Sequence, residues 1–269
     1  MTSVPTMPLT IALYGALAFY ALGTLVAFSS LFTREKRIQY AGLALMIAGF
    51  VAHTIWIGTI CTATGHPPIT NLAEVVSFVA WTVFAVELGL WIRYRVYAAV
   101  FFVYPLVLLL LTLSAVAGES FRVLDPELRS NVFTAHLLLT TVGVAGLMIG
   151  LAFGFLAMLQ DRALKNKTRG RLWDWIPSLD VCKNVSYRAL AIGFSIYTVG
   201  LLAGVLWSYR TTAGFMDLRV KQIGAVTAWI LFGVILQSYV DNTYRRRRTL
   251  FISAGAFVAI VVAMLGIRG

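Results

Sequence analysis

Charged residues and cysteines are both scarce in this sequence. Charged residues make up 12% of the 269 positions, whereas hydrophobic residues make up 59%. A soluble domain carries about twice that share of charge, so the composition excludes an ordinary soluble globular protein. The two cysteines form no CxxC pair, which excludes a disulfide framework and an internal thiol relay. P-loop, HExxH, GxSxG and glycine-rich dinucleotide motifs are also missing, which leaves an ATPase or a hydrolase without support.

Long apolar runs fill most of the chain. They are continuous and lack the alternating pattern of barrel strands, so helices are predicted rather than a β-barrel. A helix needs roughly 20 apolar residues to cross the hydrocarbon core of a bilayer. The sequence therefore predicts an all-α, polytopic transmembrane helix bundle of about eight spans, at residues 9–32, 39–60, 72–91, 97–117, 132–159, 187–208, 223–240 and 250–267.

Basic residues gather after every second predicted span. Clusters lie at 34–37, 93–95, 162–188 and 245–248, whereas the other connecting segments hold few. The positive-inside rule therefore predicts that both termini are outside and that the basic segments are cytoplasmic. The net charge of +11 follows from this asymmetry and suits contact with anionic lipid headgroups. We interpret the arginines at 245–248 as a lipid anchor and expect no nucleic-acid partner.

The same topology bears on the cysteines and on the first span. Cys61 is predicted at the outer end of the second span and Cys182 in a cytoplasmic segment, so the two cannot pair. The first span lacks a basic leader and a small-residue cleavage site, so we expect it to be a retained helix. Residues 1–269 are expected to form a single integral membrane domain. The longest interruption, 160–186, contains Trp173 and Trp175 and is predicted to lie at the membrane interface.

Glycines recur in the fifth and sixth predicted spans and have two interpretations. Small faces allow two helices to approach closely within a bundle. They also leave flat surfaces that would admit a bulky planar ligand. The glycines concerned are Gly143, Gly146, Gly150 and Gly154 in the fifth span, and Gly193, Gly200 and Gly204 in the sixth.

The sequence has only three histidines, His53, His66 and His136. His66 is predicted in an outer loop, His136 near the outer start of the fifth span, and His53 about 10 Å from the outer end of the second. All three are thus predicted in the outer half of the bundle. An ionisable residue within a span is a functional candidate because its burial in lipid is costly. Neutral imidazole is also a common ligand of haem iron; for each histidine the alternative is a hydrogen-bonded packing residue.

Two carboxylates fall within the predicted third span. Glu74 at its outer start would cap the helix or support a ligand imidazole. Glu87, toward its inner end, would reach the cytoplasmic interface or pair with an arginine. No spaced array of carboxylates is present, which argues against a proton pump or an ion transporter.

Three sequence blocks resemble the CcsA/ResC-type cytochrome c assembly proteins. The first, GHPPITNLAEVVSFVAW, covers 65–81 and resembles an outer Gly-His-x-Pro followed by Asn-x-x-Glu at a helix start. The second, LDPELRSNVFTAHLLLTTVGVAG at 124–146, resembles the segment that leads to an outer haem-ligand histidine, here His136. The third, YRALAIGFSIYTVGLLAGVLW at 187–207, resembles the helix before a tryptophan-rich loop. The resemblance covers most of residues 40–240.

The chain departs from this pattern after the third block. The family has a Trp-Gly-x-Tyr-Trp-x-Trp-Asp-Pro-Lys-Glu loop, whereas this chain reads WSYRTTAGFMDLRVKQ and keeps only Trp207, Tyr209 and Gly214. The family's next histidine falls near Gln237, and its last one has no counterpart. The departures indicate a divergent branch. One such branch resembles the HemX-type membrane proteins associated with tetrapyrrole synthesis.

The resemblance implies a membrane protein of the bacterial inner membrane that binds and handles non-covalent, b-type haem in cytochrome c biogenesis, as an accessory protein rather than an enzyme. The resemblance carries over His136 as an axial iron ligand. From their predicted outer position, His53 or His66 would be the second ligand, and Trp207 and Arg210 would contribute to the haem site. The implied partners are the lipid bilayer, a second assembly subunit and an apocytochrome c. The alternatives are a HemX-type regulator acting through the basic segment 162–188, and a small-molecule transporter. Further outer cations available to the propionates are Arg122, Arg129, Arg219 and Lys221.

Overall fold

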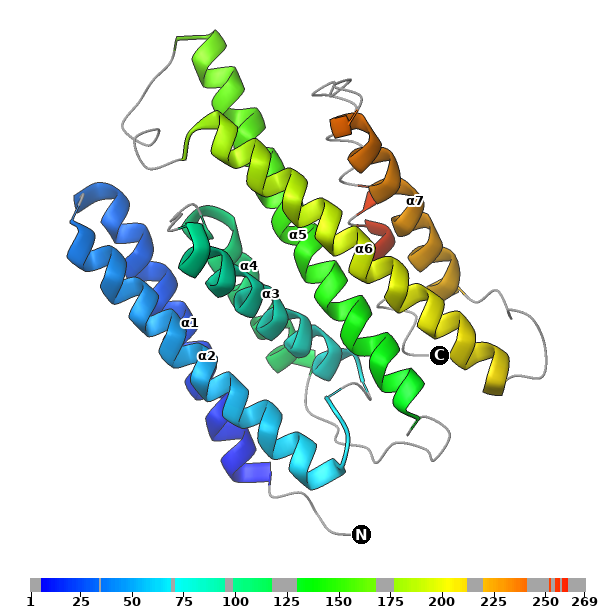
Figure 1. Ribbon diagram of the computed structural model, residues 1–269. Coiled ribbons are helices and arrows are strands. Elements are labelled where there is room, and N and C mark those ends of the chain that lie inside the picture. The colour runs from blue at the N-terminus through cyan, green and yellow to red at the C-terminus, as the bar shows by residue number, and fades with distance from the viewer. Residues whose placement is uncertain are drawn as a thin grey trace. The chain divides into compact units, whose positions relative to one another are not determined.

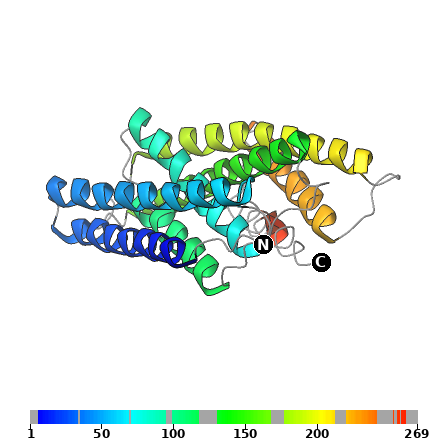
Figure 2. The ribbon, with the colours of Figure 1, turned by 90° about the horizontal axis from the view of Figure 1, so that it is seen from below.

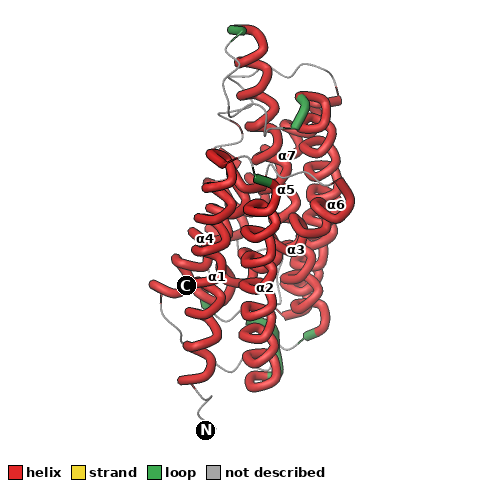
Figure 3. Tube along the Cα trace, turned by 90° about the vertical axis from the view of Figure 1, so that its left-hand side faces the viewer, coloured by secondary structure: helices red, strands yellow, loops and turns green. Residues whose placement is uncertain are grey.

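All secondary structure described by the computed structural model of this chain is helical (Figure 3). The structure describes residues 6–33, 35–68, 71–94, 99–117, 130–167, 177–211 and 220–240, together with 252, 255, 256 and 258–260. Within these residues there is no strand, which confirms the predicted all-α class. The helices are α1 (Thr6–Thr33), α2 (Lys36–Thr64), α3 (Leu72–Tyr94), α4 (Ala99–Ala117), α5 (Asn131–Lys165), α6 (Leu179–Thr211) and α7 (Val220–Val240).

Six of the described helices are long and apolar enough to cross a bilayer, and Phe102–Ala117 within α4 is a shorter apolar helix. The chain is therefore a multi-pass membrane protein, as its sequence predicts. Most of the predicted eighth span, 250–267, lies outside the described residues. Those of its residues that are described are helical, and Gly255 lies against Leu231 of α7.

The chain divides into two compact units, Met1–Asp125 and Pro126–Gly269. Unit 1 contains α1 to α4, and unit 2 contains α5, α6 and α7. Each is described by itself below. That they act as a single integral domain stays a prediction.

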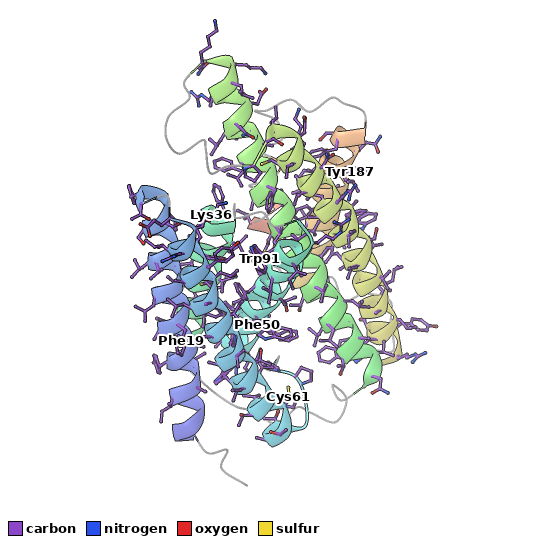
Figure 4. The ribbon with its side chains drawn as sticks, turned by 60° about the vertical axis from the view of Figure 1, so that its left-hand side comes forward. Phe19, Lys36, Phe50, Cys61, Trp91 and Tyr187 are labelled. Carbon is purple, nitrogen blue, oxygen red and sulfur yellow. The ribbon has the colours of Figure 1, made fainter. Side chains whose placement is uncertain are left out.

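Unit 1 is built on an extensive contact between α1 and α2, to which α3 and α4 add a second helix pair (Figures 1 and 2). Glycines bring the first two helices together: a Cβ at Gly42 would lie 2.8 Å from the backbone nitrogen of Ala27. Large aromatic side chains fill the interior, and Tyr20, Trp56 and Phe84 are almost completely buried. Figure 4 shows Lys36 at one end of α2, Cys61 toward the other and Phe50 between them.

In unit 2 the glycines of α5 and α6 each face a residue of the opposite helix. A Cβ at Gly143 would lie 2.7 Å from the Cα of Tyr197, and one at Gly150 would lie 2.6 Å from Leu190. At the centre Gly146 faces Gly193, so the two backbones touch. In this regular antiparallel register, glycines of one helix contact larger residues of the other. The helices α5 and α6 are the most extensively packed pair of the described chain.

That packing decides between the two interpretations of the glycine faces. Close helix approach is confirmed, because the space above these glycines is filled by the opposite helix. The interpretation that the same faces admit a planar ligand is wrong for Gly143, Gly146, Gly150 and Gly193. Gly204 differs, because the group that fills its space is the imidazole of His136.

The helices α5 and α6 extend well past their predicted ends. We predicted an interfacial interruption over 160–186, but α5 continues to Lys165 and α6 begins at Leu179. Basic residues in the last turn of α5 and Asp180 in the first turn of α6 complement the helix dipoles, and Lys165 bonds Asp161 at 2.8 Å. At 35 residues, α5 is about 52 Å long, so charged residues prolong the helix beyond the bilayer. Trp173 and Trp175 lie outside the described residues.

A buried hydroxyl links the three helices of unit 2. The Oγ of Ser186 in α6 lies 2.7 Å from the carbonyl oxygen of Gly150 in α5 and 2.9 Å from the hydroxyl of Tyr239 in α7. The carbonyl only accepts, so Ser186 donates to Gly150 and Tyr239 donates to Ser186. Gly154 leaves room for both hydroxyls.

Replacing this hydroxyl is expected to weaken unit 2. Ser186→Ala removes both interhelical hydrogen bonds of this hydroxyl, to Gly150 and from Tyr239, so we expect a loss of about 1 to 2 kcal/mol in the free energy of unfolding. The matched control is Ser195→Ala on the same helix, because the exposed Ser195 bonds only Ala191 within α6. Denaturant titration in bicelles measures both variants. Equal stability of the two would contradict the interhelical role.

Candidate functional site

The three histidines are divided between the units. His53 in α2 and His66 in the loop after it belong to unit 1, and His136 in α5 belongs to unit 2. Among the described residues no group of three or more His, Cys, Asp or Glu side chains is arranged to hold a metal ion. Haem iron needs only one or two protein ligands, since the porphyrin supplies the equatorial nitrogens.

His136 is held by the backbone of α6. Its Nδ1 lies 2.7 Å from the carbonyl oxygen of Gly200. Because a carbonyl accepts and does not donate, Nδ1 carries the proton, and the lone pair of the neutral imidazole is on Nε2. The ring also packs on Gly204, where a Cβ would lie 2.6 Å from Nδ1. Gly204 thus leaves room for the imidazole, and the carbonyl of Gly200 fixes its tautomer.

Aromatic side chains continue the site toward the predicted outer ends of the helices. The ring of Phe133 lies 6.4 Å from that of His136 and 4.8 Å from that of Trp207. Ser130 fixes the start of α5 just before them, because its Oγ accepts the backbone N–H of Phe133 at 3.1 Å. We call His136, Phe133 and Trp207, with Gly200 and Gly204, the His136 site.

Arg210 lies near the end of α6, three residues after Trp207, and is exposed. A cation so placed is available to a carboxylate ligand near this end of the helix. The other cations predicted near the propionates, Arg122, Arg129 and Arg219, lie outside the described residues, as does the side chain of Lys221.

His66 lies in a tight loop between α2 and α3. The loop begins at Gly65, which has φ 76° and ends α2 in a left-handed conformation that favours glycine. The imidazole is 7% exposed, and its Nδ1 donates to the carbonyl of Pro67 at 2.7 Å. This side chain is therefore held by its own loop.

The start of α3 stabilises the other side of the same loop. Asn71 Oδ1 accepts the backbone N–H of Glu74 at 2.9 Å, and Asn71 Nδ2 donates to the Glu74 carboxylate at 3.0 Å. This reciprocal arrangement is a capping interaction of the helix N-terminus. The cap residue of α3 is thus Asn71 rather than the predicted Glu74, whose carboxylate accepts from the Asn71 side chain.

His53 is enclosed within unit 1. Its side chain has no exposed surface, and Nε2 lies 2.7 Å from the hydroxyl of Ser77 in α3. Its ring contacts Tyr20 at 6.0 Å and Trp56 at 5.8 Å. Eleven residues separate His53 from the end of α2, which is about 16 Å along the axis. His53 and the loop of His66 therefore do not form one ligand pair.

Sequence analysis missed three partners of these histidines. Ser77, Gly200 and Gly204 are ordinary residues of apolar helices, and only the packing register shows which of them meets which imidazole. The spacing of Gly200 and Gly204 was a signal for close packing, but it did not indicate a histidine as the neighbour.

Comparison with known proteins identifies similar sequences over most of the chain. Residues 69–269 match the model of the family described as "Cytochrome C assembly protein". A relative from Guillardia theta named "Cytochrome c biogenesis protein CcsA" is 24% identical over 88% of this chain and 85% of its own. Relatives with the same name from Prochlorococcus marinus and Synechocystis are 22% and 23% identical, over 96% and 88% of this chain and 91% and 87% of theirs.

Proposed function

Because the chain belongs to the cytochrome c assembly protein family, we propose that it acts in cytochrome c biogenesis as a membrane protein that binds haem non-covalently, with His136 as an axial ligand. The relatives' names support the first part of this proposal. The haem site is our inference from the residues of unit 2.

The geometry of His136 is the observation that carries the proposal. Histidines that ligate metals usually donate their second ring N–H to a carboxylate or a backbone carbonyl, which orients the ring and makes it a stronger ligand. The hydrogen bond from Nδ1 to Gly200 is of this kind and assigns the lone pair to Nε2. Gly204 leaves the space that the imidazole ring occupies.

The residues around His136 are also suited to contact a bound haem. Phe133 and Trp207 supply aromatic surface against which a porphyrin plane packs favourably. Arg210 supplies a guanidinium for a propionate. Bound haem would be the iron-containing group that is delivered to an apocytochrome. The role of this chain's residues is to hold that group and orient it.

The other two histidines that we propose as iron ligands, His53 and His66, belong to unit 1. His53 would have to exchange its hydrogen bond to Ser77 for the metal, and its enclosed position would require the helices around it to separate. His66 lies in a loop and not in the middle of a helix, so its ring needs a smaller rearrangement.

The proposed partners would supply the cysteines to which haem is covalently attached. Covalent haem attachment needs a CxxCH motif, which this sequence does not contain. We infer that an apocytochrome c supplies it and that a second assembly subunit cooperates with this chain. The bacterial inner membrane is the compartment that we propose.

The optical spectrum of the purified protein tests the proposal. The full chain is expressed in haem-replete cells, purified in mild detergent and scanned, with the pyridine haemochrome assay for quantification. We expect a Soret band and haem that organic solvent extracts, as a non-covalent cofactor requires. Protein that is folded but free of haem, and stays so after haemin is added, would contradict the proposal.

A further inference from the structure

One face of α3 carries polar groups into the interior of unit 1. Ser77, Phe84, Glu87 and Trp91 follow one another at helical spacing and lie on the same side of the helix. Ser77 and Phe84 are fully buried, and Glu87 is only 3% exposed. Glu87 thus faces the unit's interior, seven residues before the end of a helix that is apolar enough to cross the membrane.

No charge partner accompanies this carboxyl group. Within the described residues Glu87 forms no ion pair, and its Oε2 has no hydrogen-bond partner. The predicted pairing of Glu87 with an arginine is therefore not found among the described residues, whereas its reaching the cytoplasmic interface stays a prediction. Arg93, on the same helix, is exposed to the outside of the unit.

The helices packed against α3 also bring no charge to Glu87. The described residues of α1 and α4 include no Lys, Arg, Asp or Glu. Their titratable groups nearest this face are Tyr20 and Tyr104, whose rings lie 5.7 Å and 6.1 Å from that of Phe84, one turn from Glu87. On α2 the buried titratable group is His53, and the cations Lys36 and Arg37 are exposed at the helix start.

A carboxylate in such surroundings is far less stable than the neutral acid. Moving an unpaired charge out of water costs several kcal/mol, and a buried group avoids that cost by taking up a proton. Ionisable residues within membrane spans are rare, and where they occur they serve functions such as proton transfer.

We propose that Glu87 is a proton-binding site in the membrane-embedded interior of unit 1, where its carboxyl group is held as the neutral acid. Other polar groups lie in the same interior. The hydroxyl of Tyr20 and Nδ1 of His53 are buried without a described hydrogen-bond partner, and Tyr20 contacts both His53 and Phe84. This site is independent of the His136 site and does not rest on haem binding.

A lipid-soluble carbodiimide tests this assignment, because it reacts with protonated carboxyl groups in apolar surroundings. The acid's O–H adds across a C=N bond: oxygen bonds to the central carbon, and the proton goes to nitrogen. The acyl group then moves from oxygen to the other nitrogen, which gives a stable N-acylurea without a leaving group. Dicyclohexylcarbodiimide, applied to the full chain in membranes at neutral pH, is expected to modify Glu87, and peptide mass spectrometry locates the adduct.

The controls separate a buried acid from an ordinary carboxylate. Glu87→Gln is expected to remove the adduct, whereas Glu35→Gln, which changes an exposed carboxylate, is expected to leave it. A water-soluble carbodiimide is expected to spare Glu87. The proposal is overturned if dicyclohexylcarbodiimide leaves Glu87 unmodified, or if the water-soluble reagent modifies it equally.

Infrared spectroscopy and stability give a second, independent test. The carbonyl band of a protonated carboxylic acid is expected in the wild-type spectrum at neutral pH and missing in that of Glu87→Gln. The amide resembles the neutral acid in shape and charge, so this variant is expected to keep the wild-type melting temperature. A carboxylate band in place of the acid band, or marked destabilisation by the substitution, would overturn the proposal.

Discussion

A His136→Gly variant is expected to bind haem at least about 100-fold more weakly than the wild-type protein, and free imidazole is expected to restore binding. Loss of a group that merely orients a metal ligand costs about 10- to 100-fold in affinity, so loss of the ligand itself costs at least that much. The variant also leaves a space beside Gly204, which the imidazole ring occupies in the wild type. Haemin titration, followed at the Soret band with and without imidazole, measures both effects.

A neighbouring residue provides the matched control. Glycine within a helix is less favourable than alanine by about 1 kcal/mol, and this cost is independent of any haem contact. Ala135→Gly introduces the same cost at an exposed position beside His136 and keeps the imidazole, so it is expected to retain haem. If imidazole fails to rescue the His136→Gly protein, or if Ala135→Gly loses haem equally, His136 is a packing residue.

A Gly193→Ala substitution is expected to destabilise unit 2. Its Cβ would lie 2.8 Å from the backbone nitrogen of Leu147 and 3.0 Å from the carbonyl oxygen of Gly143. Backbone atoms within a helix are not free to move aside, so α5 and α6 must separate. Overpacking of this kind costs about 1 to 3 kcal/mol, and denaturant titration in bicelles measures it.

The corresponding control is Gly233→Ala on α7. A Cβ there would lie 3.5 Å from the ring of Phe194, an ordinary contact with a side chain. Alanine favours the helix by up to about 1 kcal/mol over glycine, so this variant is expected to be as stable as the wild type or more so. A Gly193→Ala protein as stable as Gly233→Ala would contradict the close approach of α5 and α6.

Much of the fold was predictable because the bilayer imposes simple requirements. A span must be long, apolar and helical, and these properties are local in the sequence. The helix ends were less predictable. The charged segment after Leu159 was expected to leave the helix, yet Asp161 and Lys165 stabilise it one turn apart. Hydropathy predicts which residues lie in the hydrocarbon core of the bilayer, but it does not predict the residue at which a helix ends.

The candidate site was predictable in its residues but not in its contacts. His136 and His53 stood out because an ionisable side chain in a span is unusual. What distinguishes them is the neighbour of each imidazole: Gly200 for one and Ser77 for the other. These pairs depend on the axial register of one helix against another. Hydrophobic periodicity does not predict that register. Glu87 shows the same limit, since its inward orientation required coordinates.

Electron paramagnetic resonance of the ferric, haem-loaded protein tests the central claim most directly. The protein is labelled with ¹⁵N only at histidine, so the porphyrin nitrogens stay ¹⁴N and the hyperfine couplings identify an axial imidazole. In the His136→Gly protein rescued with unlabelled imidazole, we expect the ¹⁵N coupling of the His136 imidazole seen in the wild type to be replaced by a ¹⁴N coupling, while any ¹⁵N coupling of a second axial histidine stays. The same ¹⁵N axial coupling, unchanged in that rescued variant, would contradict the assignment of His136 as the haem ligand.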